Sequence, residues 1–132
     1  MERVTKIVGV VLALHLIAGM LHGLPHFSVP VELKAWQWVF ILLVINLIPV
    51  VGFILIWRQY PRLGSAIFTV SMAGALLFGL YSHFLVPNPD NVGHVHGVWH
   101  LPFLLTAVLV AATDFVGVVT GAWVLTSKTS KE

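Results

Sequence analysis

The chain contains four long apolar stretches separated by short polar segments, at about residues 4–24, 33–57, 63–86 and 99–125. Each is about as long as the roughly 20 apolar residues that a helix needs to cross a bilayer. The pattern predicts an all-α, polytopic membrane protein, a single domain (1–132) built as a four-transmembrane-helix bundle. A secretory signal is the alternative for the first stretch, although no small-residue cleavage pattern follows it.

Composition agrees with this prediction and excludes several classes of protein. Hydrophobic residues make up 58% of the chain and charged residues 9%, whereas a soluble domain is about a quarter charged. The net charge of +2 is too small for a nucleic-acid-binding surface, so the lipid bilayer is the expected partner. The chain has no cysteine, which excludes disulfides, iron–sulfur clusters and covalently attached c-type haem.

Basic side chains are distributed unevenly over the flanks of the four stretches. Lys34 lies on one side, and six others lie on the opposite side: Arg3, Lys6, Arg58, Arg62, Lys128 and Lys131. Because cytoplasmic flanks carry the excess of Lys and Arg, both termini are expected to be cytoplasmic. The chain would then be a multi-pass protein of a plasma membrane or an inner membrane.

Histidine is unusually frequent, with seven residues against five acidic ones. With the expected topology, six of them fall at the outer membrane face: His22, His26, His83, His94, His96 and His100. Imidazole is a frequent metal ligand, and ionisable side chains are disfavoured against lipid. The distribution therefore predicts a ligand-binding outer face. Pro25 weakens the case for a helical His22–His26 pair, because proline can end a helix.

Three of the outer histidines come from three different spans at matching depth. We expect His22, His83 and His100 to face the bundle interior and to bind haem b. The lack of cysteine fits non-covalent haem. This hypothesis predicts electron transfer in a membrane redox system, with other redox subunits or further copies of the chain as partners.

Two alternatives remain open. His26, His94 and His96 could hold copper or zinc at the outer face, with His100 and Asp90 as further ligands, because imidazole suits both metals. The chain could also be a non-catalytic accessory subunit of a larger membrane complex, which explains its apolarity but not its histidines. The sequence contains neither a nucleotide-binding glycine loop nor a Gly-x-Ser-x-Gly motif, so neither nucleotide hydrolysis nor serine hydrolase chemistry has support.

A second polar group lies near the middle of the membrane. His15, Asn46 and Asp114 come from three different spans at similar depth. A carboxylate there is costly and is normally paired, so His15 and Asp114 are expected to form a buried polar pair. Such a pair would serve either a ligand site or the register of the helices. Pro49 has no N–H group and therefore leaves the carbonyl of Ile45 without its helical partner.

Overall fold

The computed structural model describes residues 1–29 and 31–127. Four of its helices are long and apolar enough to cross a membrane: Glu2–His26, Ala35–Trp57, Pro61–Leu85 and Gly97–Thr126. Their ends lie within two residues of the stretches predicted from the sequence. The prediction of an all-helical chain with four such helices is confirmed.

Two of the four long helices contain π-helical segments. Of the four long helices, the first is α1 (Glu2–His26), which is α-helical throughout. The second consists of α2 (Ala35–Phe40), a π-helical segment (Ile41–Leu47) and α3 (Ile48–Trp57). The third is α4 (Pro61–Leu80) with a π-helical turn at its end (Tyr81–Leu85). Two short 3-10 turns (Val92–His94 and Gly97–Trp99) precede α5 (His100–Thr126).

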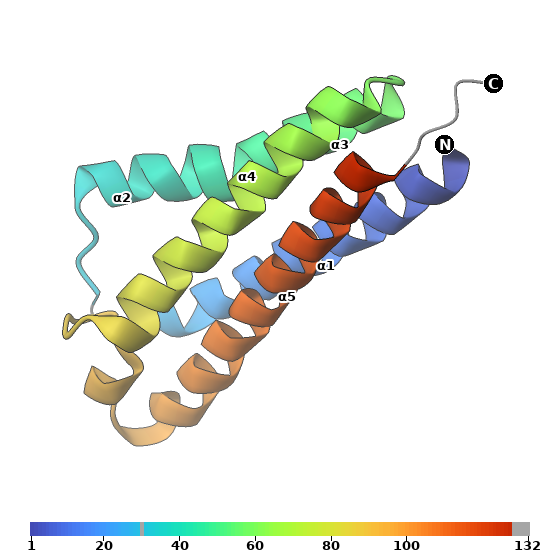
Figure 1. Cartoon of the computed structure of the whole chain (residues 1–132). Coiled ribbons are helices and arrows are strands. Elements are labelled where there is room, and N and C mark those ends of the chain that lie inside the picture. Colours follow the sequence, from blue (N-terminus) through green and yellow to red (C-terminus); the bar gives the residue numbers. More distant parts are fainter. Residues whose placement is uncertain (30, 128–132) are drawn as a thin grey trace.

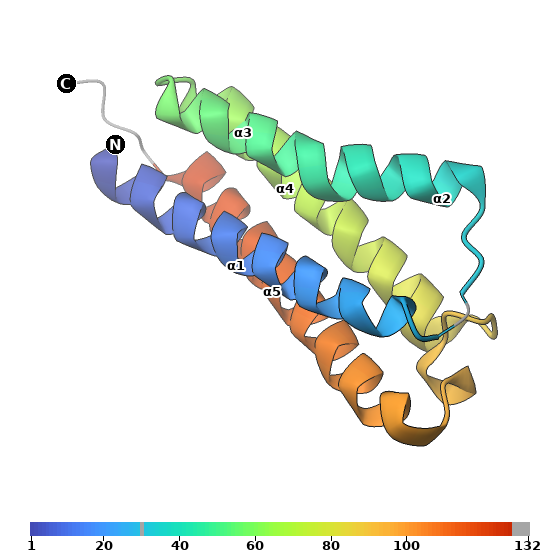
Figure 2. The same cartoon turned by 180° about the vertical axis from the view of Figure 1, so that it is seen from behind.

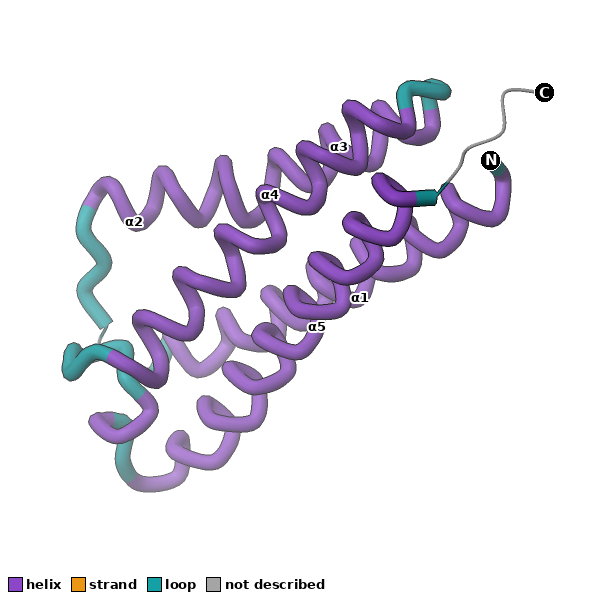
Figure 3. The backbone as a smooth tube through the Cα atoms, viewed as in Figure 1, coloured by secondary structure: helices purple, strands orange, loops and turns teal. Residues whose placement is uncertain are grey.

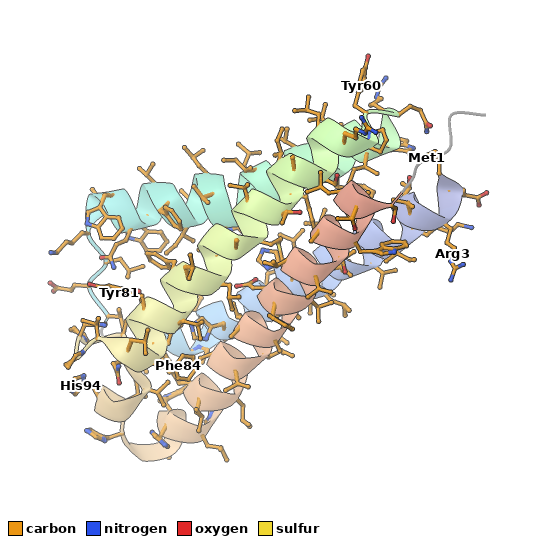
Figure 4. The ribbon with its side chains drawn as sticks, in the orientation of Figure 1. Met1, Arg3, Tyr60, Tyr81, Phe84 and His94 are labelled. Atoms are coloured by element: carbon orange, nitrogen blue, oxygen red, sulfur yellow. The ribbon has the colours of Figure 1, made fainter. Side chains whose placement is uncertain are left out.

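The four long helices run roughly side by side, and their connections lie at two opposite ends (Figures 1 and 3). One end, here called the terminal end, holds the N-terminus and the turn between α3 and α4 (Figure 2). Arg3 and Tyr60 lie there, whereas Tyr81, Phe84 and His94 lie at the opposite end, here called the loop end (Figure 4). Two basic residues of the charge argument, Lys128 and Lys131, lie outside the described residues.

The helices pack around α4 and α5. α4 contacts both α3 and α5, and α1 packs mainly against α5. The closest approach is between α3 and α4, where a Cβ on Gly52 would stand 2.9 Å from the carbonyl oxygen of Gly64. Glycine at these positions lets the two backbones meet directly, as is common between membrane helices. The buried apolar core lies towards the terminal end: Val8, Val11, Leu12, Ile56, Phe68, Met72 and Val124.

Many large apolar side chains point outward rather than into this core. Val70 is 73% exposed, Leu77 67% and Ile17 52%. A water-soluble protein rarely exposes so much contiguous apolar surface, because its contact with water is unfavourable. The outward surface is therefore suited to contact with lipid chains.

Candidate functional site

Three histidines meet at the loop end, and we call His22, His26 and His83 the imidazole cluster. Nε2 of His22 lies 3.1 Å from Nε2 of His83 and 3.2 Å from Nε2 of His26. His22 and His83 are buried, with exposures of 8% and 7%. The cluster thus joins the end of α1 to the π-helical turn after α4.

The local backbone explains how the cluster forms. The sequence argument allowed Pro25 to end the first helix, but α1 continues through Pro25 to His26. His22 and His26 therefore share a helix face, and their ring centroids are 4.9 Å apart. His83 lies in the π-helical turn Tyr81–Leu85, and such turns are frequent at functional sites.

A phenylalanine ring from the fourth span packs beside all three imidazoles. The centroid of Phe103 is 5.1 Å from that of His22, 5.2 Å from that of His26 and 5.6 Å from that of His83. Phe103 is fully buried. Its packing limits the room in which the three rings can turn, and it supplies an apolar wall that keeps water away from them.

Oxygen atoms hold the far nitrogens of two cluster members. Nδ1 of His83 lies 3.0 Å from the backbone carbonyl oxygen of Asp90 and 3.4 Å from its carboxylate. Nδ1 of His22 lies 3.0 Å from the hydroxyl of Thr106. Asp90 is buried at 4% exposure, and its Oδ1 is also 3.5 Å from Nε2 of His26. These contacts orient the rings and direct Nε2 of both His22 and His83 into the cluster.

The partners of His83 fix where its proton lies. A carbonyl and a carboxylate oxygen accept hydrogen bonds, so His83 donates from Nδ1–H, and its Nε2 carries a lone pair when the ring is neutral. When Thr106 donates its hydroxyl to the carbonyl of Pro102 at 2.8 Å, it accepts from His22 Nδ1–H, and in this tautomer His22 Nε2 carries a lone pair as well. Two lone pairs that face each other repel. A shared cation, either a proton or a metal ion, would stabilise this arrangement.

Two polar atoms of this site have no hydrogen-bond partner among the described residues. They are Nδ1 of His26 and Oδ1 of Asp90, both buried. A buried polar atom without a partner is unfavourable by about 1–3 kcal/mol. The other ring nitrogen of His26, Nε2, lies 3.5 Å from Asp90 Oδ1, which is too long for a strong hydrogen bond. The burial of both atoms is therefore not compensated by a hydrogen bond within the described chain.

The other three histidines of the loop end, His94, His96 and His100, lie apart from the imidazole cluster. His94 donates from Nδ1 to the carbonyl of Asn88 at 2.7 Å, and His100 donates from Nδ1 to the carbonyl of Val95 at 2.8 Å. His94, His96 and His100 are all exposed. Within residues 1–29 and 31–127, no hydrogen bond joins them to the cluster.

The structure thus divides the predicted ligands differently from the sequence argument. It brings together His22 and His83 of the expected haem set with His26 of the expected metal set, and it leaves His100 outside. Across the described parts of the chain, no group of three or more His, Asp or Glu side chains has an arrangement that could hold a metal ion. The sequence argument named Asp90 as a ligand beside the loop histidines and not as a partner of His83, and it did not name Thr106. Asp90 had one signal, as the acidic residue in the loop that follows His83, but Thr106 had none.

The deeper polar group forms a contact between three spans. Nδ1 of His15 lies 2.6 Å from Oδ1 of Asp114, and Nε2 of His15 lies 2.9 Å from the carbonyl oxygen of Ile45. Pro49 leaves that carbonyl without its helical donor, and the imidazole takes the vacant role. Asn46 instead donates to the carbonyl of Ile41 in its own helix at 2.7 Å.

The partners of His15 also determine the protons of this pair. The carbonyl oxygen of Ile45 can only accept a hydrogen bond, so Nε2 of His15 carries a proton and donates it. One further proton lies between Nδ1 of His15 and the Asp114 carboxylate. The pair then carries no net charge, either as an ion pair or as two neutral groups. Both residues are almost fully buried, at 2% and 0% exposure. Neutrality makes this burial tolerable in an apolar environment.

Comparison of the chain with models of known protein families, with curated proteins and with solved structures finds no match.

Proposed function

We propose that this chain is a multi-pass membrane protein that binds a transition-metal ion through the imidazole cluster. The observation that carries the proposal is the position of His22 Nε2, which lies 3.1 Å from His83 Nε2 and 3.2 Å from His26 Nε2. In the tautomer in which Thr106 accepts from His22 Nδ1–H, Nε2 of His22 and Nε2 of His83 face each other with lone pairs. A cation bound between them would convert this repulsion into attraction.

The spacing of the nitrogens suits a small cation. Imidazole nitrogens lie about 2.0–2.1 Å from zinc, so two nitrogens in a tetrahedral site are about 3.3–3.4 Å apart. The two nitrogen pairs in the cluster would need to open by only a few tenths of an ångström from 3.1 and 3.2 Å. Asp90 would then act as the oxygen partner that orients His83, an arrangement common around histidine ligands. Copper and zinc both suit such a site.

Haem b, bound by His22, His83 and His100, remains the alternative cofactor. Axial haem ligands stand on opposite sides of the iron, whereas His22 and His83 are in direct contact and His100 bonds to Val95. These contacts favour a metal ion over haem. Haem b or copper would support electron transfer with other redox subunits, whereas zinc has no redox chemistry. A role as an accessory subunit is compatible with each of these cofactors.

The expected orientation places the terminal end in the cytoplasm and the imidazole cluster at the outer face of a plasma or inner membrane. The basic residues of the described terminal end, Arg3, Lys6, Arg58 and Arg62, support this orientation. The chain has no cysteine, so single cysteines at Gln59 and Gly93 can report sidedness. An impermeant maleimide added to intact cells should label Gly93→Cys and not Gln59→Cys; the reverse pattern would contradict the orientation.

Metal binding can be tested on protein purified with a histidine-free affinity tag. The purified protein is exposed to limiting zinc or copper, freed of unbound ion and analysed by elemental mass spectrometry. We expect a single bound ion per chain, lost in His22→Ala and in His83→Ala. His96→Ala is the matched control, because His96 is exposed and has no side-chain hydrogen bond in the described part of the chain.

The outcomes separate the candidate functions. The imidazole cluster would be refuted as the site if wild type, His22→Ala and His83→Ala bound the same amount of metal. It would also be refuted if none of the three bound metal. A visible spectrum with a Soret band that shifts on reduction would instead support haem b. Equal loss of metal in His96→Ala and His22→Ala would point to the outer loop rather than the imidazole cluster.

A further inference from the structure

A shallow groove lies at the terminal end, far from the imidazole cluster. It has a volume of about 760 Å³ and is formed between α1 and the end of α3 with the turn that follows. Its apolar walls include Gly9, Val10 and Ala13 on one side and Phe53 and Trp57 on the other. Its polar lining is at the outer rim, where it includes Lys6 and Gln59.

The groove exists because α1 carries little side-chain volume where it faces α3. A Cβ on Gly9 would stand only 3.1 Å from the ring of Phe53, so glycine lets the ring pack directly against the α1 backbone and line the groove. Ala13, one helical turn further along α1, is also small and is exposed. α1 packs chiefly on α5, and its weaker contact with α3 leaves the groove open to the side.

The length of the groove matches one leaflet of a bilayer. Its α1 wall runs from Glu2 to Ala13. At 1.5 Å per residue this wall is about 16 Å long. Half of a hydrocarbon core of about 30 Å is about 15 Å. An acyl chain that enters from the terminal end would therefore lie along the groove over the full depth of its leaflet.

The charge at the mouth of the groove favours an anionic headgroup. Four basic residues belong to this end of the described chain, Arg3, Lys6, Arg58 and Arg62, against one acidic residue, Glu2. Lys6 is paired with Glu2 at 2.6 Å, but both side chains are highly exposed, and such pairs contribute little. Trp57 is 61% exposed beside the mouth, a position typical of the membrane interface.

We propose that this groove is a binding site for an anionic phospholipid. One acyl chain packs along the lining formed by Val10, Ala13 and the ring of Phe53, and the phosphate lies among the basic side chains at the terminal end. The proposal is independent of metal binding at the opposite end. It explains why the apolar part of the groove lies at hydrocarbon depth while its polar rim lies at the chain terminus.

The test uses native mass spectrometry of protein from nanodiscs that contain phosphatidylglycerol and phosphatidylcholine. Wild type should retain phosphatidylglycerol in preference. Gly9→Leu and Ala13→Leu should each lower its retention by about tenfold, equivalent to about 1.4 kcal/mol. Ala13→Leu covers the case in which Gly9→Leu fails to fold. Gly19→Leu is the matched control, because the same residue is added on α1 where no atom lies within 4 Å of the new Cβ.

Each outcome is decisive for the groove. Preferential retention that both groove variants lose and Gly19→Leu keeps would support a built lipid site. Equal retention by all four proteins would show general lipid contact only and would overturn the proposal. A dimer that Gly9→Leu and Ala13→Leu dissociate, without loss of lipid, would assign the groove to a second copy of the chain and would also overturn it.

Discussion

His15 and Asp114 form a buried pair, and we expect the interaction between their side chains to stabilise the folded protein. We consider His15→Leu, Asp114→Val and the double variant. His15→Leu leaves a buried carboxyl group without its imidazole, and Asp114→Val leaves the imidazole with one unpaired nitrogen. The double variant removes both polar side chains, so neither is left unpaired, and only the carbonyl of Ile45 loses its donor, as it also does in His15→Leu.

The structure places the expected effect well above that of an ordinary hydrogen bond. Both residues are 2% exposed or less, and Oδ2 of Asp114 already has no partner in the described chain. Leaving a buried polar group unsatisfied costs about 1–3 kcal/mol, and breaking a buried charged pair about 3–5 kcal/mol. We therefore expect each single variant to lose about 2–3 kcal/mol and the coupling energy to be about 2 kcal/mol.

The assay is reversible unfolding in mixed micelles, with the denaturing detergent increased stepwise. The chain has five tryptophans, so intrinsic fluorescence reports the transition without a label. Thr113→Val is the matched control, because Thr113 precedes Asp114 and bonds only to carbonyls of its own helix, Leu109 and Val110. We expect this control to change stability by less than about 0.5 kcal/mol.

A coupling energy below about 0.6 kcal/mol would refute the reasoning, because that is the average for hydrogen-bonded pairs between membrane helices. Additive losses in the double variant would lead to the same conclusion. In either case the short contact between His15 and Asp114 would be a consequence of helix packing and would not stabilise it.

Two further predictions concern the metal site and the helix contact. Asp90→Ala should weaken metal affinity by about 10–100-fold without abolishing binding, since it removes the carboxylate beside His83 but no nitrogen ligand. A metal titration monitored by elemental analysis measures this affinity, and an unchanged affinity would exclude Asp90 from the site. Gly52→Ala should lower the free energy of unfolding by about 1–3 kcal/mol, because its Cβ would meet backbone atoms of α4 at 2.9 Å. Gly23→Ala is the control: its Cβ would meet nothing within 4 Å, so stability in the same unfolding assay should not change.

The positions of the four helices could be predicted from the sequence because they depend on a local property. A run of apolar residues must form backbone hydrogen bonds within itself when it enters lipid, and the helix satisfies this requirement. The same argument required Asp114 to find a partner, and His15 was the basic side chain available at that depth. The freed carbonyl of Ile45 followed from Pro49 alone, because proline has no N–H group.

The composition of the imidazole cluster depended on the tertiary structure. Depth along the chain could not separate His26 from His100, since both lie near the loop end. The choice between them required the rotation of each helix, the continuation of α1 through Pro25 and the π-helical turn that carries His83. Asp90 reaches the site because its loop folds back over His83. Helix length is set by neighbours in sequence, whereas the meeting of side chains is set by how the helices pack, and the packing depends on the whole chain.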